Sequence, residues 1–367
     1  MKTKLSSVVM THPQRLAHAK QLVATAGLSG IVQDPAPDMP SSPIRTALRA
    51  WGAVAPEASH HLVVQDDILT VPFMTDLVIK CVQRHPRAAL AFYSNWNSRN
   101  GTLVRLAALA GASWIDAAPL EYTPTLALCL PADVARDFAR HTTDPIAPDD
   151  DAAMARFLRE REIPVLLSVP NVIEHMGVES LSGNNHHGIR RATCFYTGDE
   201  VIPRLVEGPH LRLPHWLPSL FQGEGFVLSE DAEGGPLGKV LPWEEGLQSL
   251  QARCSALAAA LETEPPRHIQ KVIVESFGVR YTNDLWAHGV MLGWQAAGAH
   301  RGSPPPDTHD PIRLKALESL GPSSLNADRR SALTEFEAQA LTFYGSTSVA
   351  VGARSRSLGQ RADRVPS

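Results

Sequence analysis

The chain has 367 residues, enough for two domains or for one large α/β domain with an additional segment. Hydrophobic residues make up 44% and charged residues 20% of it, which excludes a disordered, coiled-coil or collagen-like chain. With a net charge of −4, the chain has no overall basic field that would collect nucleic acid or an anionic membrane.

The cysteines and the apolar runs indicate a compartment. The four cysteines lie far apart without a C-x-x-C pair, so neither a zinc site nor a disulfide framework is expected. Leu5–Met10 is too short an apolar run for a secretion signal, and no stretch reaches the roughly 20 apolar residues of a spanning helix. We therefore predict a cytoplasmic protein without a membrane span.

Strands and helices alternate along the first half of the chain, which predicts parallel pairing in an α/β sheet. The expected strands cover residues 5–10, 31–34, 61–65, 88–93, 123–130 and 164–169, and the expected helices cover 13–26, 44–54, 73–85, 132–141 and 150–161. Gly27 is expected to end the first helix.

From about residue 200 onward, prolines cluster and the alternation stops, which indicates a boundary. Residues 1–198 are therefore predicted to form the α/β domain, 199–345 a mainly helical annex, and 346–367 a flexible tail without periodicity. The annex is expected to contain helices at 243–262, 269–278, 283–297 and 329–343. Its apolar helices carry Trp243, Trp286 and Trp294, which favour either a homodimer contact or a lid within the chain.

The sharpest chemical feature is the acidic pair Asp66-Asp67, directly after the buried strand 61–65. Ligands of open α/β sheets bind at the carboxyl ends of strands. Two adjacent carboxylates repel each other there, and a divalent cation bridging them to a diphosphate offsets the repulsion. The alternative is a solvated turn in which one Asp caps a helix. The buried strand in front favours the cation site.

Three segments resemble the GT-A glycosyltransferases of the family 2 type: Val-Val-Met-Thr-His-Pro-Gln-Arg at 8–15, His-Leu-Val-Val-Gln-Asp-Asp-Ile at 61–68, and Asp-Asp-Asp at 149–151. The resemblance covers residues 5–198. It implies a Rossmann-like, mostly parallel central sheet flanked by helices and a sugar transfer from a nucleotide-diphosphate donor. The family's D-x-D motif, which binds Mn²⁺ or Mg²⁺ and through it the diphosphate, stands here as the variant Gln65-Asp66-Asp67.

The resemblance also implies roles for the acidic residues. Asp67 is the expected direct metal ligand, with Asp66 on the ribose or on a metal-bound water. Inverting members take their general base from an acidic helix start, where crowding raises the pKa of one carboxyl. Asp150 is the first candidate for this base and Asp151 the second, while helix capping is the structural alternative.

A third metal ligand of the family, a histidine, corresponds to the region after the last strand. His175 is the preferred candidate, ahead of His186, and a packing histidine is the alternative. Arg190, in the pair Arg190-Arg191, is a candidate for neutralising the leaving diphosphate, with a solvated basic turn as the alternative.

The remaining candidates concern the nucleotide and the acceptor. The resemblance places the nucleobase and ribose at the end of the first strand, at Thr11, His12 and Arg15, where a helix N-terminus also favours anions. The polar loop 94–101 offers amides, a flat apolar face and a cation, which suit sugar hydroxyls. Its candidate acceptor-binding residues are Asn95, Trp96, Asn97 and Arg99, although Trp96 is also suited to capping the core.

Other enzyme classes lack their motifs in this chain. There is no G-x-G-T-R loop of a pyrophosphorylase, no G-x-G-x-x-G, no P-loop and no G-x-S-x-G. The sequence therefore predicts a metal-assisted, inverting glycosyltransferase with a nucleotide-sugar donor. The alternative is a non-catalytic GT-A-like protein that binds a nucleotide or a partner, as Gln65 and the long annex suggest. The sugar, the nucleobase and the acceptor stay open.

Overall fold

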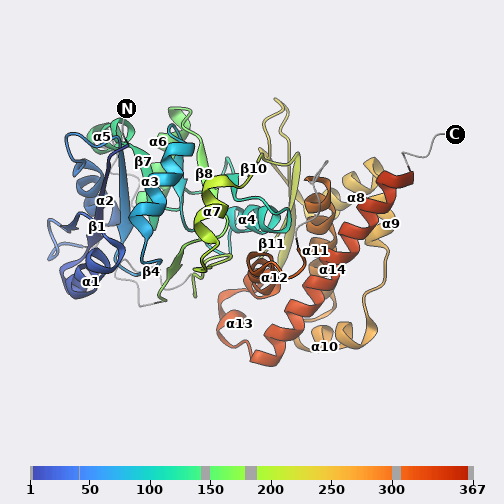
Figure 1. Ribbon diagram of the computed structural model, residues 1–367. Coiled ribbons are helices and arrows are strands. Elements are labelled where there is room, and N and C mark those ends of the chain that lie inside the picture. The colour runs from blue at the N-terminus through green and yellow to red at the C-terminus, as the bar shows by residue number, and fades with distance from the viewer. Residues whose placement is uncertain (1–2, 41, 142–148, 178–187, 300–306, 363–367) are drawn as a thin grey trace. The chain divides into compact units, whose positions relative to one another are not determined.

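The computed structural model describes residues 3–40, 42–141, 149–177, 188–299 and 307–362 (Figure 1). The chain forms two compact units. The first comprises residues 1–95 and 121–208, and the second comprises residues 96–120 and 209–367. Among the described residues, no helix combines the length and apolar character that crossing a membrane requires.

The first unit contains a mixed sheet, in which the described strands follow the order β8-β5-β7-β3-β1-β2. These strands are β1 (Leu5–Thr11), β2 (Gly30–Gln33), β3 (His60–Gln65), β5 (Ala89–Ala91), β7 (Ala127–Pro131) and β8 (Val165–Ser168). β1 pairs in parallel with β2 and β3, whereas β7 runs antiparallel to β3 and to β5. The α/β class is confirmed, but the sheet is more mixed than expected, because alternation of elements does not fix the direction of each strand.

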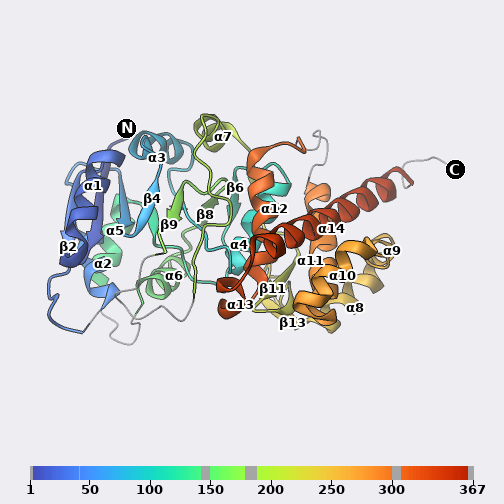
Figure 2. The ribbon, with the colours of Figure 1, turned by 90° about the horizontal axis from the view of Figure 1, so that it is seen from below.

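Helices flank this sheet (Figure 2). On one face lie α1 and α3, and on the other lie α2, α5 and α6, which contact one another through α2. Their bounds, with the short helices η1 and α7, are η1 (Pro13–Arg15), α1 (Leu16–Ala26), α2 (Pro43–Gly52), α3 (Met74–Arg84), α5 (Ala132–His141), α6 (Asp150–Glu160) and α7 (Val201–Glu207). Gly27 ends α1 at φ 69°, as the sequence predicted.

A separate two-stranded ribbon lies beside the sheet's acidic end. It pairs β4 (Ile68–Thr70) antiparallel with β9 (Ile173–His175), and Ile68 stands opposite His175. The backbone N–H of Met176 donates to the carbonyl of Asp67 at 2.9 Å. This pairing brings His175 to the acidic pair across more than a hundred residues of sequence.

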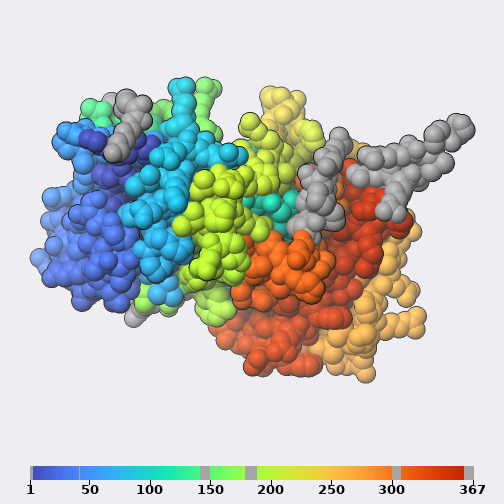
Figure 3. All heavy atoms as spheres, viewed as in Figure 1, coloured from blue at the N-terminus to red at the C-terminus, as the bar shows by residue number. Residues whose placement is uncertain are grey.

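The second unit combines helices with one three-stranded sheet and one further pair of strands. Strands β11, β12 and β13 form an antiparallel sheet, and β6 pairs in parallel with β10. The strands are β6 (Trp114–Asp116), β10 (His210–Leu211), β11 (Trp216–Phe221), β12 (Glu224–Ser229) and β13 (Lys239–Pro242). The helices are α4 (Arg99–Leu109), α8 (Trp243–Arg253), α9 (Ser255–Leu261), α10 (Arg267–Phe277), α11 (Val279–Ala299), α12 (Pro311–Ser324), α13 (Ala327–Ser331) and α14 (Glu335–Ala362). In the space-filling view, α12 and α14 lie side by side at the surface (Figure 3).

The annex differs from its prediction in composition and in bounds. The second unit takes in residues 96–120 as well, and it holds the sheet β11-β12-β13, which the prolines around residue 200 concealed. The expected helix 243–262 is divided at Cys254, whose extended backbone separates α8 from α9.

The predicted tail at 346–367 is wrong over most of its length, because α14 continues to Ala362; residues 363–367 lie outside the described residues. The Ser and Gly content hid two small residues, Ser348 and Gly352, at which α14 packs on α11. A Cβ at Gly352 would stand 1.9 Å from the carbonyl oxygen of Val290. Only glycine allows the two backbones to approach so closely here.

The three tryptophans of the annex do not form an exposed dimer surface. Trp243, Trp286 and Trp294 are only 4%, 5% and 5% exposed and belong to the hydrophobic core of the second unit. Their indoles therefore stabilise the unit itself.

Candidate functional site

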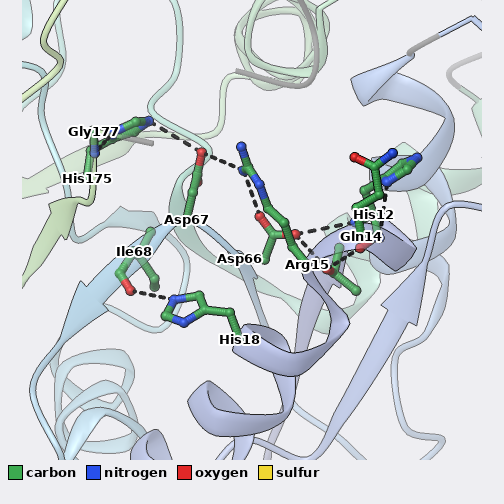
Figure 4. Close-up of polar contacts among 10 residues, drawn as sticks. His12, Gln14, Arg15, His18, Asp66, Asp67, Ile68, His175 and Gly177 are labelled. Carbon is green, nitrogen blue, oxygen red and sulfur yellow. Dashed lines mark hydrogen bonds and ion pairs between the residues drawn. The ribbon is translucent and has the colours of Figure 1, made fainter. Parts of the chain in front are cut away.

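The acidic pair lies where the sequence predicted it, at the carboxyl end of a central strand. Asp66 and Asp67 follow β3 directly, and Thr11 to Arg15 follow the neighbouring parallel strand β1. Parallel strands end at the same edge of the sheet, so the two segments meet there (Figure 4).

Three groups from the β1 end hold the Asp66 carboxylate. The hydroxyl of Thr11 donates to Oδ2 at 2.5 Å, and the backbone N–H of His12 donates to the same oxygen at 3.3 Å. Arg15 donates from a guanidinium nitrogen to Oδ1 at 3.2 Å (Figure 4). Asp66, only 6% exposed, therefore has both oxygens engaged and fixes the β1 end against β3.

Asp67 is held on one oxygen only. The same Arg15 nitrogen donates to its Oδ2 at 3.2 Å, and Nε2 of His175 lies 3.4 Å from that oxygen. Burial alone raises the pKa of Asp67, but the imidazole of His175 and the charges of Arg15 and Arg190 outweigh it and hold this pKa below its ordinary value. Oδ1 of Asp67 is buried and has no hydrogen-bond partner among the described residues.

His175 does not fit the predicted role of metal ligand. Its Nδ1 accepts a hydrogen bond from the backbone N–H of Gly177 at 2.9 Å, so Nδ1 carries no proton (Figure 4). The ring proton of neutral His175 is then on Nε2, the nitrogen that faces Asp67. A protonated nitrogen has no lone pair for a metal, and the imidazole is instead a positioning group for Asp67.

The donor set restricts the kind of metal site that fits. Within the part of the chain that the structure describes, no three His, Cys, Asp or Glu side chains are grouped to hold an ion. Mg²⁺ and similar ions are, however, commonly bound by one or two carboxylates together with substrate phosphates and water. The unpartnered Oδ1 of Asp67 fits this second kind of site, in which the ion arrives with the diphosphate.

The second acidic group opens α6, as predicted. Asp149 is the exposed N-cap residue, Asp150 is 6% exposed, and Asp151 is partly exposed. Burial raises the pKa of Asp150. Burial, and next the charge of Asp150, raises the pKa of Asp151 to about 7.

Thr123 and Thr125 lie beside both acidic groups. The side-chain amide of Gln65, the residue before the acidic pair, donates to the hydroxyl of Thr125 at 3.3 Å. Thr125 also acts on the carboxyl of Asp150 and favours its ionised form, although burial outweighs this effect and raises the pKa of Asp150. Oδ2 of Asp150 has no hydrogen-bond partner among the described residues. The backbone N–H of Thr123 also donates to the carbonyl of Asp151 at 3.4 Å. Residues more than eighty positions apart in sequence therefore belong to one site within the first unit.

Two groups that the sequence analysis did not single out position the basic side of this site. The hydroxyl of Tyr93 donates to the carbonyl of Arg190 at 2.9 Å. Glu174 accepts from the backbone N–H groups of His175 at 2.9 Å and of Ala192 at 2.6 Å. These contacts tie the segment around Arg190 to β9, and they join residues with no local sequence signal.

The sequence analysis also missed Asp34, although its position directly after a predicted strand is a signal of the same kind as that of Asp66. Asp34 follows β2 directly and stands at the same carboxyl edge as Asp66. Arg45 donates to both Asp34 oxygens, at 2.8 and 2.7 Å. This contact is the main cause of the lowered pKa of Asp34. The pair closes the loop between β2 and α2, because its two members stand at the loop's two ends.

The predicted acceptor-binding residues lie where the chain passes from the first unit to the second. Asn95 belongs to the first unit and forms a β-bridge with Ala192. The others, Trp96, Asn97 and Arg99, belong to the second unit. There, the guanidinium of Arg99 donates to the carbonyl of Leu120 at 3.1 Å and lies 5.6 Å from the ring centre of Phe226. Trp96 is 8% exposed, as the core-capping alternative predicted, and His186 lies outside the described residues.

Comparison with known proteins finds no family model that matches the chain and no match among curated proteins.

Replacing Arg15 with glutamine tests the electrostatics of the site. Two partly buried carboxylates then lose their shared cation, and we expect the free energy of unfolding at pH 7 to fall by about 2 kcal/mol. Arg15 lowers the pKa of Asp67, so the loss should shrink at pH 3, as the pH falls toward this lowered pKa. Urea unfolding at both pH values measures it. Arg15→Lys, which keeps the charge, should recover part of the loss; wild-type stability of Arg15→Gln at pH 7 would refute the pairing.

Proposed function

We propose that the chain is a glycosyltransferase that uses a nucleotide-sugar donor, with its catalytic site at the carboxyl end of β1 and β3. The observation that carries the proposal is the position of Thr125, which accepts a hydrogen bond from Gln65 beside the acidic pair and acts on the carboxyl of Asp150 at the start of α6. This position supports a site that combines Asp67, a carboxyl suited to a diphosphate-bound metal, with the carboxyls at the start of α6. A sugar transfer needs both functions, one at each side of the anomeric carbon.

Asp151 is the better general base of the two candidates. Its side chain is partly exposed, and its pKa near 7 allows it to accept a proton at neutral pH. Asp150 is more deeply buried and is engaged with Thr125, which suits a positioning residue.

In the proposed reaction, an acceptor hydroxyl attacks the anomeric carbon while Asp151 takes up the hydroxyl proton. The bond from the anomeric carbon to the phosphate oxygen breaks, and its electron pair leaves with the nucleoside diphosphate. Arg190, whose charge lowers the pKa of Asp67, would stabilise the leaving diphosphate. Mn²⁺ or Mg²⁺, held by Asp67 and the diphosphate, would add positive charge to the leaving group when bound.

Consumption of a nucleotide sugar with Mn²⁺ present tests the proposal. The second candidate is a non-catalytic nucleotide-binding protein, which the ion pairs of Arg15 with both carboxylates favour, because they neutralise the acidic pair without a metal. Binding of the nucleotide without any consumption of the sugar donor would support this candidate.

A further inference from the structure

The second unit contains a pocket of about 340 Å³, which we call the α8–α11 pocket. Its walls come from α8, from the connection between α9 and α10, and from α11. This volume is in the range of small-molecule sites. The pocket lies wholly within one unit, and the inference drawn from it does not rest on the proposed function.

The apolar walls of the pocket are fixed in place by polar contacts. Trp286 donates its indole N–H to the carbonyl of Thr263 at 3.0 Å, and Trp243 lies close enough to Asp284 to favour its ionised form. Both rings are nearly buried and line the pocket, so it is formed before any ligand arrives. An alkyl or ring-shaped body is suited to these walls.

The charged groups of the lining are all acidic. Among the described residues that line the pocket, Asp284, Glu262 and Glu264 carry carboxylates and none is Lys, Arg or His. Glu262 and Glu264 are exposed near the opening, and Glu264 has Arg267 at 3.7 Å in a largely solvated pair of little strength. The lining therefore favours a positively charged ligand.

Asp284 is the group that such a ligand would meet. It is 8% exposed, and its Oδ2 has no hydrogen-bond partner among the described residues. The nearest cation, Nε of Arg280 on the same helix, is 3.8 Å away, too far for a hydrogen bond, and its side chain is 72% exposed. Burial raises the pKa of Asp284, whereas Arg280 and Trp243 favour its ionised form. A buried carboxylate oxygen without a donor is costly and gains from one.

We propose that the α8–α11 pocket binds a small organic molecule with an apolar body through a primary ammonium group, and that Asp284 receives that ammonium. A primary ammonium supplies N–H donors, which a quaternary ammonium lacks. The tryptophan walls take the body of the molecule, and the ammonium adds a charge-assisted hydrogen bond.

Calorimetry on the full chain at neutral pH tests the proposal with two probes of matched shape, cyclohexylamine and cyclohexanol. The amine should bind at least tenfold more tightly than the alcohol. Asp284→Asn should remove this preference, and Glu275→Gln, which changes a carboxylate of α10 that pairs with Lys271 at 3.8 Å, should leave it unchanged. Arg280→Ala should strengthen amine binding, because the competing cation is gone.

Arg280→Ala separates an effect on binding from an effect on folding, because a damaged fold would weaken amine binding and this variant is expected to strengthen it. Equal affinity for amine and alcohol would overturn the proposal, because the pocket would then select its ligand by shape and not by charge. Binding of glucose without binding of the amine would identify a saccharide site instead and would also overturn it. No binding of the amine at millimolar concentration, in wild type and in Arg280→Ala, would do the same.

Discussion

Asp151→Asn is expected to lower the turnover of a nucleotide sugar by roughly 10²- to 10⁴-fold, the usual effect of losing a general base. Water serves as the acceptor in the assay, so donor hydrolysis reports the base without knowledge of the natural acceptor. Asp150→Asn is the matched control, since an asparagine oxygen still accepts from Thr125, and its loss should stay below tenfold. The reverse order of the two effects would assign the base to Asp150.

The pH dependence gives the same variant a second signature. Wild-type turnover should rise with pH through about 7, as Asp151 loses its proton, and the rise should be absent in Asp151→Asn. The pKa of Asp151 is higher in the folded than in the unfolded chain, so its contribution to stability is present below about pH 4 and is lost as pH rises through about 7. At pH 8, the free energy of unfolding of Asp151→Asn should therefore be about 2 kcal/mol higher than that of wild type.

A variant that is both inactive and more stable at pH 8 distinguishes a catalytic from a structural carboxyl. Urea unfolding at pH 5 and pH 8 measures the stability part, and the gain should be much smaller at pH 5. If Asp151→Asn is instead less stable at both pH values, Asp151 is a capping residue of α6 and the base assignment fails.

Asp67→Asn is expected to abolish the coupling between a metal and a nucleoside diphosphate. In wild type, Mn²⁺ should raise the affinity for UDP, GDP or dTDP by roughly a hundredfold, whereas Mn²⁺ alone should bind weakly, because Asp67 supplies one ligand and the diphosphate the others. The amide of asparagine is a poor substitute for the carboxylate, so the variant should bind the nucleotide equally in Mn²⁺ and in EDTA.

Titration calorimetry with each nucleotide, in Mn²⁺ and in EDTA, measures this coupling. Asp76→Asn, which removes an exposed carboxylate from the first turn of α3, is the control and should keep the full effect of Mn²⁺. His175→Gln should reduce the coupling only in part, because His175 positions Asp67 and does not bind the ion. Equal effects of Mn²⁺ in wild type and in Asp67→Asn would show that the ion binds elsewhere.

Much of the first unit was predictable from sequence because its signals are local. The apolar runs Val8–Met10 and Leu62–Val64 predicted β1 and β3, and Gly27 predicted the end of α1. The place of Asp66 and Asp67 followed from the strand in front of them. Strand direction was not predictable in this way, since the antiparallel insertion of β7 between β3 and β5 depends on contacts distant in sequence.

The site was predictable as a set of acidic residues but not as a network. The contacts of Arg15 with both carboxylates and of Gln65 with Thr125 join segments about fifty and sixty residues apart, for which the sequence has no pattern. The hydrogen bond from the N–H of Gly177 to His175, which argues against His175 as a metal ligand, has no signal in the sequence. The prediction of a flexible tail at 346–367 failed because the small residues that let α14 pack closely are the same residue types that are typical of a flexible segment.

The most direct test of the central claim, that the first unit holds an inverting sugar-transfer site, is the anomeric configuration of the first product. Proton NMR follows an α-linked nucleotide sugar, chosen from a panel of UDP, GDP and dTDP donors, during slow hydrolysis by the full chain with Mn²⁺. We predict that the free sugar appears first as the β-anomer, before mutarotation, and that EDTA stops its release. An α-anomer as the first product would contradict the single displacement assisted by Asp151, and a panel left wholly unconsumed would contradict the transferase itself.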